Sequence, residues 1–266
     1  MKIFIAETSC IQPGADLPLT LARDLRRADG FISLAVQAGF AVLGGEASMQ
    51  PRSGCHGLVL GTAFGPMQTN FEVLDQVVLQ EQTSPTLFSH SVFNAAAGYL
   101  SRIFGLQGSA ITVTDFAFPF FQALQQGSIA VASGRLDSCL ILQVETYSDI
   151  LADARTRIVG KDSAPWQAGA IAWLLSRERG MREIEAIDVH LQPSDGVAYI
   201  SIAEQLTTSS QCLNLTDPLA SALAVTRLLA ESDREERSFQ LSAPYGHIQL
   251  YCKPSTPERE KHGTRK

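Results

Sequence analysis

The chain is short of charged residues and has no long apolar run. Asp, Glu, Lys and Arg make up 18% of its 266 residues, and the net charge is −6. An acidic balance argues against nucleic acid as a partner, because phosphate binding needs an excess of Lys and Arg. No apolar run approaches the ~20 residues of a membrane helix, and Glu7 interrupts the apolar start too early for a signal peptide. We therefore expect a globular cytoplasmic protein with no membrane span.

The cysteines lack the spacing of a disulfide framework or a zinc site. They are odd in number and widely scattered, and none belongs to a CxxC pair: Cys10, Cys55, Cys139, Cys212 and Cys252. The five histidines form neither an HExxH motif nor a pair at helical spacing. We expect a reducing compartment and no metal site.

Three common catalytic motifs are also missing. The sequence has no GxSxG nucleophile elbow, no GxxxxGK[ST] phosphate loop and no GxGxxG dinucleotide turn. These absences argue against a serine hydrolase, a P-loop enzyme and a dinucleotide-dependent enzyme. We expect no cofactor.

What the sequence does contain is an alternation of short apolar strands and helices. Periodicity predicts strands over 2–6, 56–61, 109–114 and 138–144, and helices over 21–44, 71–82, 85–105 and 119–132. Gly105 is expected to end the third of these helices. Such an alternation indicates a mostly parallel, layered α/β sheet.

The second half of the chain is sparser in regular structure. We expect a loop or short helix over 147–165, strands over 169–176 and 184–191, a helix over 217–231 and a hairpin of 239–242 with 247–252. The charged tail 255–266 is expected to be disordered.

The strand 109–114 leads through a turn at 115–118 into a helix that opens with Pro119. A helix N-terminus of this kind can stabilise a thiolate, and its amides can hold an oxyanion. The turn contains no nucleophile, and Asp115 is better placed as a helix cap than as an attacking group. We therefore expect the turn to be catalytically silent.

Several motifs in order resemble the β-ketoacyl synthase family of the thiolase superfamily. The likeness lies in Asn94–Gly108, with Asn-x-Ala-Ala-Gly and Gly-Leu-x-Gly, and in Gly61–Gly65, Arg26–Asp29, Gly134–Leu142 and Ala168–Leu175. The resemblance implies a thiolase-like layered αβαβα fold. It implies one domain over 1–254, with a complete N-terminal half over 1–150 and a shortened C-terminal half over 151–254.

The resemblance also implies that the catalytic machinery is degenerate. The family's cysteine nucleophile falls on Ala117, and its two C-terminal histidine motifs are missing. This pattern is similar to the chain length factors, which dimerise with an active ketosynthase and close one end of its acyl tunnel. The short form is similar to those of aryl polyene biosynthesis. The implied partners are a full-length β-ketoacyl synthase and, through it, an acyl carrier protein, in polyene, polyketide or fatty-acid-like synthesis.

Two sets of site residues follow from the same resemblance. The strand before the turn would pair across a two-fold axis and form the dimer interface: Ser109, Ala110, Ile111, Thr112, Val113 and Thr114. The segment 86–93 and the turn would line the substrate tunnel: Leu87, Phe88, His90, Val92, Phe93, Phe116 and Phe118. No residue is assigned a catalytic role.

Two other hypotheses remain open. The protein could be an enzyme in its own right, an acyltransferase or decarboxylase that uses His90 and backbone amides, or it could be a homodimeric acyl-binding protein. Arg23, Arg26 and Arg27 could meet an acidic partner, although a solvated helix face is the simpler interpretation.

Overall fold

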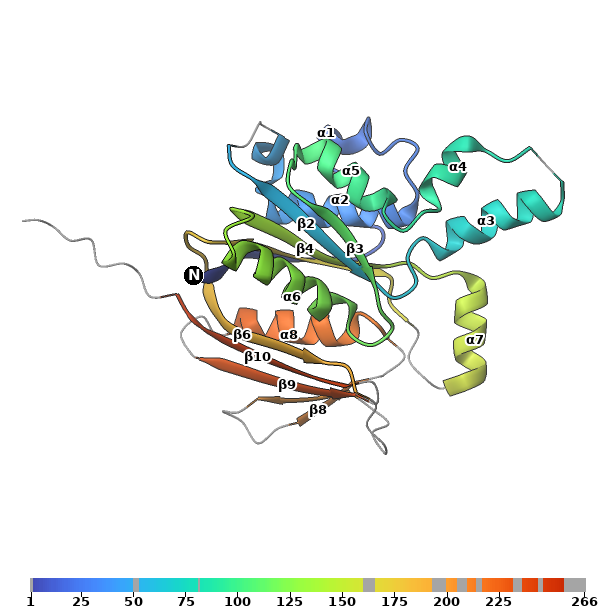
Figure 1. Ribbon diagram of the computed structural model, residues 1–266. Coiled ribbons are helices and arrows are strands. Elements are labelled where there is room, and N and C mark those ends of the chain that lie inside the picture. The colour runs from blue at the N-terminus through green and yellow to red at the C-terminus, as the bar shows by residue number, and fades with distance from the viewer. Residues whose placement is uncertain are drawn as a thin grey trace, which may run out of the picture.

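The structure is a computed structural model that describes residues 2–49, 53–80, 82–159, 166–192, 200–204, 210–213, 217–231, 236–243 and 246–255 (Figure 1). Its strands are β1 (Ile3–Ile11), β2 (His56–Thr62), β3 (Ala110–Thr114), β4 (Ser138–Glu145), β5 (Gly169–Ser176), β6 (Arg182–His190), β7 (Ile200–Glu204), β8 (Ser210–Leu213), β9 (Arg237–Ala243) and β10 (Gly246–Pro254). Its helices are α1 (Leu19–Ala22), α2 (Gly30–Val42), the 3₁₀ helix η1 (Gly45–Met49), α3 (Met67–Val78), α4 (Pro85–His90), α5 (Ala95–Phe104), α6 (Pro119–Ala132), α7 (Asp149–Val159) and α8 (Ala220–Glu231).

The strands form one sheet in the order β3-β2-β4-β5-β1-β6-β10-β9-β7-β8. Only β2, β3 and β4 run parallel to one another, and the other pairs are antiparallel. The mostly parallel pairing predicted from the first half of the chain is confirmed for these three strands and is wrong for β1, which pairs antiparallel with β5 and β6. Helices connect β2 to β3 and β3 to β4, as parallel pairing requires, whereas β9 and β10 form the predicted hairpin.

Helices pack in layers against this sheet (Figure 1), so the predicted layered α/β architecture is confirmed. One core lies under α2 and α5, where Leu34, Ala38 and Leu100 meet Leu58 and Leu140. A second core surrounds α6 and α8 and includes residues of both halves of the sheet. Along β10, buried residues alternate with partly exposed ones. The buried residues Ile248, Leu250 and Cys252 of this strand belong to the second core.

Two helices predicted as continuous are each split. The helix expected over 21–44 is interrupted, because the Asp29 side chain accepts a hydrogen bond from the Ile32 amide at 2.8 Å and starts α2 anew. The helix expected over 85–105 divides into α4, capped by Ser84, and α5. Gly105 ends α5 with a φ of 62°, as predicted.

The remaining predictions have mixed outcomes. Residues 149–159 of the polar segment form α7, so the short helix is confirmed, whereas β7 and β8 were not predicted. The tail 256–266 lies outside the described residues, and the division of the chain at 150 and 254 stays a prediction. None of the helices within the described ranges is long and apolar enough to span a membrane.

Candidate functional site

The turn between β3 and α6 carries no nucleophile, and its amides are already bonded. The Asp115 carboxylate accepts hydrogen bonds from the amides of Ala117 at 3.0 Å and Phe118 at 3.2 Å. It also accepts one from Gln122 Nε2 at 2.6 Å. The predicted helix-capping role of Asp115 is wrong, because the N-cap of α6 is Phe118 and no side chain caps this helix. This carboxylate therefore occupies two amides of the turn that could otherwise hold an oxyanion.

A buried carboxylate lies at the end of β4, which pairs with the other side of β2. Glu145 accepts hydrogen bonds from the amides of Ala63 at 2.6 Å and Phe64 at 3.2 Å, and from Thr62 Oγ1 at 3.1 Å. Burial raises the pKa of Glu145 to about 7, against the effect of these hydrogen bonds, which lower it. The sequence analysis missed this residue. The available signal was an acidic residue directly after an apolar strand.

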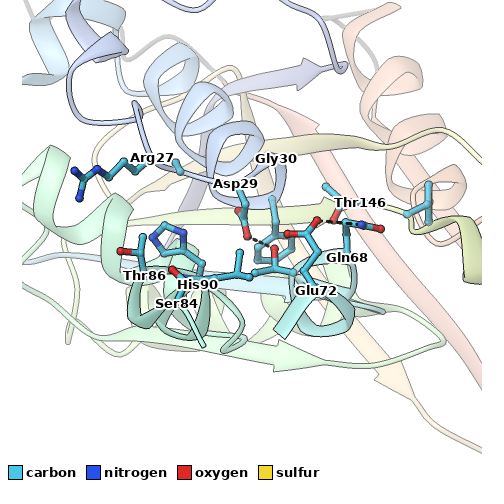
Figure 2. A pocket seen from close by; sticks show the side chains of 14 residues that line it. Arg27, Asp29, Gly30, Gln68, Glu72, Ser84, Thr86, His90 and Thr146 are labelled. Atoms are coloured by element: carbon cyan, nitrogen blue, oxygen red, sulfur yellow. Dashed lines mark hydrogen bonds between the residues drawn. The ribbon is translucent and has the colours of Figure 1, made fainter. Parts of the chain in front are cut away.

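A pocket of about 490 Å³ lies between the start of α2, the helices α3 and α4, and the segment after β4 (Figure 2). Asp29 accepts a hydrogen bond from Thr69 Oγ1 at 2.6 Å on its wall. Arg27 is exposed at this site, as are Arg23 and Arg26 nearby in the chain.

His90 also lines this pocket and is 4% exposed. Its Nε2 lies 3.0 Å from the Tyr99 hydroxyl. Since a phenol is not the activated thiol or hydroxyl of a nucleophile–base pair, this contact gives no support to His90 as a catalytic base.

The predicted tunnel residues divide into exposed and buried groups. Phe88 is 60% exposed, Val92 44%, Phe93 39% and Phe116 72%. Leu87 is partly buried, and Phe118 lies in the core around α6. Phe118 has no exposed surface in this chain, whereas His90 lines the pocket described above. The tunnel assignment stays a prediction.

The β2–α3 turn brings two of the exposed tunnel residues together. The ring of Phe93 packs on Gly65, where an added Cβ would come within 2.5 Å of it. The ring of Phe64, the preceding residue, lies 5.8 Å from that of Phe116. Phe93 and Phe116 thus contact neighbouring residues of one turn, although 23 positions separate them in the sequence.

The predicted interface strand β3 lies at the edge of the sheet, where it pairs with β2 alone among the described strands. Ala110, Ile111 and Thr114 are exposed, and so is Ser109 before them, while Thr112 and Val113 are partly buried. An open strand edge with an exposed Ile is a surface on which another chain can pair.

Two of the other histidines lie side by side. His190 and His247 stack across β6 and β10 with ring centroids 4.6 Å apart. Within the ranges that the structure describes, no group of three or more His, Cys, Asp or Glu side chains could hold a metal ion.

Comparison with known proteins gives one family and one fold. Residues 22–237 match the family model of the beta-ketoacyl synthase N-terminal domain. No curated protein matches the chain. Among solved structures, the ketosynthase ApeO in complex with its chain length factor ApeC from Xenorhabdus doucetiae matches with 18% identity and a TM-score of 0.62, covering 95% of this chain and 99% of that chain.

Two further solved structures of ketosynthases also match the chain. The ishigamide ketosynthase/chain length factor matches with 17% identity and a TM-score of 0.64, covering 73% of this chain and 69% of that one. The AntDE:AntF complex of a type II polyketide synthase acyl-carrier protein with its ketosynthase matches with 13% identity and a TM-score of 0.67, covering 96% and 99%. At these identities the structural matches establish the fold, and they confirm the predicted thiolase-like α/β fold.

Proposed function

The chain belongs to the β-ketoacyl synthase family, and we propose that it is a non-catalytic subunit of the chain length factor type. In this role it pairs with an active β-ketoacyl-ACP synthase and shapes the tunnel that holds the growing chain. The observation that carries the proposal is Ala117 at the nucleophile turn, where the chain's own Asp115 carboxylate binds the amides.

Exposed apolar side chains support the proposal that the chain binds another protein. The open edge of β3 includes Ile111, which is 43% exposed. Figure 1 shows α3 and α4 projecting together from the body of the molecule, and Val77, Val78 and Phe88 on these helices are each more than half exposed. We expect the ketosynthase partner, a chain of the same fold, to cover these exposed side chains.

Similar proteins make a ketosynthase the favoured partner. The ApeO structure is described as a complex with its chain length factor, and the matched chain is covered almost completely by this one. A second copy of this chain could also pair with the open edge of β3. The experiment must therefore distinguish this homodimer from the heterodimer with a ketosynthase.

The acyl carrier protein would reach the complex from the side of the exposed arginines. Arg23, Arg26 and Arg27 are all exposed, and Arg27 lies at the 490 Å³ pocket. Positive charge of this kind attracts an acidic protein and speeds its encounter. The product class that we propose is a polyene or a related polyketide or fatty-acid-like chain.

Co-expression with a full-length ketosynthase from the same organism tests the assembly. We expect the two chains to co-purify in equal amounts and to elongate acyl chains on an acyl carrier protein. The isolated chain should show no turnover with acyl or malonyl carrier protein. A homodimer that ignores the ketosynthase, or turnover by the chain alone, would contradict the proposal.

Product analysis of variant heterodimers tests the tunnel. Phe88→Ala and Phe93→Ala remove exposed rings from 86–93, and we expect longer products without loss of turnover. Leu19→Ala is the control, because Leu19 is 92% exposed on α1, outside this segment. Unchanged chain length at every tunnel position, with the complex intact, would defeat the tunnel assignment.

A further inference from the structure

Two histidines lie opposite each other on the neighbouring strands β6 and β10 (Figure 1). The antiparallel register pairs His190 with His247, and their rings stack with centroids 4.6 Å apart and planes at 23°. Residues directly opposite in an antiparallel pair present their side chains on the same face of the sheet. His190 is exposed and His247 is partly buried, so an ion in solution can reach the pair.

The backbone fixes the position of this pair. Gly246 precedes His247 and lies so close to β6 that an added Cβ would come within 2.1 Å of the His190 carbonyl oxygen. From there the two strands stay in register as far as Tyr251, which lies opposite Ala186. The strand pairing therefore brings the two imidazoles together before any ligand binds.

The ring nitrogens of this pair are free. Within the part of the chain that the structure describes, neither ring takes part in a hydrogen bond or an ion pair. This differs from His56, whose two ring nitrogens each lie 2.8 Å from an oxygen, and from His90, which contacts the Tyr99 hydroxyl. The pair thus has nitrogen lone pairs that no protein group uses.

The side chains around the pair are polar. Asp188 lies two residues before His190, on the same face of β6, and opposite Gln249. Ser242 lies opposite His247 on the other side, on β9. A pocket of about 210 Å³ lies on β9 and β10 at this point, and its lining is Gln240, Ser242, Ala243, Gly246, His247 and Gln249.

We propose that His190 and His247 bind a late first-row divalent transition-metal ion, with Cu²⁺ bound most tightly. Imidazole is the commonest protein ligand of such ions, and Cu²⁺ has the highest affinity for a nitrogen site. Mg²⁺ and Ca²⁺ bind oxygen ligands instead, so they do not fit two imidazoles. The proposal is independent of the proposed function, because it needs neither a ketosynthase nor an acyl chain.

The geometry of the pair suits two ligands of one ion. Two imidazole nitrogens that bind one ion at about 2.0–2.1 Å lie roughly 3 Å apart. The ring centroids are 4.6 Å apart, so a small tilt of both rings towards a common ion brings one nitrogen of each to this separation. No group of three or more His, Cys, Asp or Glu forms a site within the described ranges, so water fills the remaining positions. Asp188, on the same face, can accept a hydrogen bond from such a water.

The first test is calorimetric titration of the full chain with Cu²⁺, after its exposed Cys10 and Cys55 have been alkylated so that these thiols do not bind the ion. We expect one Cu²⁺ per chain and an affinity that falls at least about tenfold in His190→Asn and in His247→Asn. His56→Asn is the matched control, because both nitrogens of that ring already have protein partners. It should keep the wild-type affinity, and Mg²⁺ should give no heat with any of these proteins.

Electron paramagnetic resonance of the Cu²⁺ complex gives a second readout. Two equivalent imidazole nitrogens should couple to the ion in the wild-type chain, and one at most in either single variant. A structural role of the histidines alone would not produce this change. The urea midpoint shows whether each variant is folded, and His247→Gln replaces any asparagine variant that is not.

Three results would overturn the proposal. The first is the absence of one-to-one binding of Cu²⁺ by the alkylated chain. The second is a complex with fewer than two coupled nitrogens, or one whose affinity is the same in folded His190→Asn and His247→Asn as in the wild type. The third is an equal loss of affinity in His56→Asn, which would place the ion elsewhere in the molecule.

Discussion

Glu145 makes the stability of the protein depend on pH. Its pKa is about 7 in the folded chain, against 4.5 ordinarily, because burial disfavours the carboxylate. Between these values the folded state binds more protons than the unfolded state, so stability is full below pH 4.5 and falls as the pH rises towards 7. Since one unit corresponds to about 1.4 kcal/mol, the loss is on the order of 3 kcal/mol.

Glu145→Gln should reduce the dependence of stability on pH, because the amide does not titrate; the contribution of Asp217, whose pKa burial also raises, remains. Urea unfolding at several pH values between 4 and 8 measures it. Glu72→Gln is the control: Glu72 is exposed on α3, and its replacement should keep the slope. An identical slope in wild type and Glu145→Gln would show that Glu145 does not retain its proton in the fold.

Two tyrosines should respond in opposite ways to the loss of a hydroxyl. The Tyr147 hydroxyl is buried without a hydrogen-bond partner among the described residues, whereas the Tyr99 hydroxyl lies 3.0 Å from His90 Nε2. An unpaired buried hydroxyl costs about 1–3 kcal/mol, and a hydrogen bond contributes about 1 kcal/mol. We expect Tyr147→Phe to raise the free energy of unfolding by about 1 kcal/mol and Tyr99→Phe to lower it by a similar amount, as measured in urea. Destabilisation by both variants would mean that Tyr147 has a polar partner.

At the scale of elements, we expect that a cysteine introduced into the β3–α6 turn will not act as a nucleophile. In Ala117→Cys the new thiol lies beside the Asp115 carboxylate, which disfavours a thiolate and holds the amides. We expect mass spectrometry to find no acyl adduct on the variant and slow alkylation by iodoacetamide at pH 7. Asp115→Asn in the same background should speed alkylation several-fold. Condensation should stay absent in both, because the family's histidine motifs are missing.

Rapid acylation of Ala117→Cys would contradict this account of the turn. Exposed Cys10 and Cys55 also react with iodoacetamide, so the modified peptide must be identified.

The elements that the sequence predicts well are those set by local periodicity. The strand over 138–144 is a run of buried apolar residues, and the helix that begins at Pro119 has its predicted start. The breaks before Gly30 and after His90 were missed because apolar spacing continues across them, and a single side-chain cap at Asp29 decides where α2 begins.

The candidate site was predicted in part for the same reason. Ala117, Asp115 and β3 follow from local sequence and the family resemblance. The hydrogen bonds of Glu145 and the packing of Phe64 on Phe116 depend on contacts between residues 52 or more positions apart, such as Glu145 with Ala63. Periodicity contains no information about such contacts.

At the scale of the whole molecule, the open β3 edge should control assembly. Ile111 is 43% exposed, so Ile111→Asp should leave the isolated chain folded while it places a charge where a partner strand would pair. We expect at least a tenfold weaker complex with the ketosynthase, measured by titration calorimetry, with an unchanged urea midpoint. Ile150→Asp is the matched control, because Ile150 is 58% exposed on α7, away from this edge. Equal affinity of wild type and Ile111→Asp would mean that the partner binds elsewhere, and the exposed helices α3 and α4 would then be the surface to test.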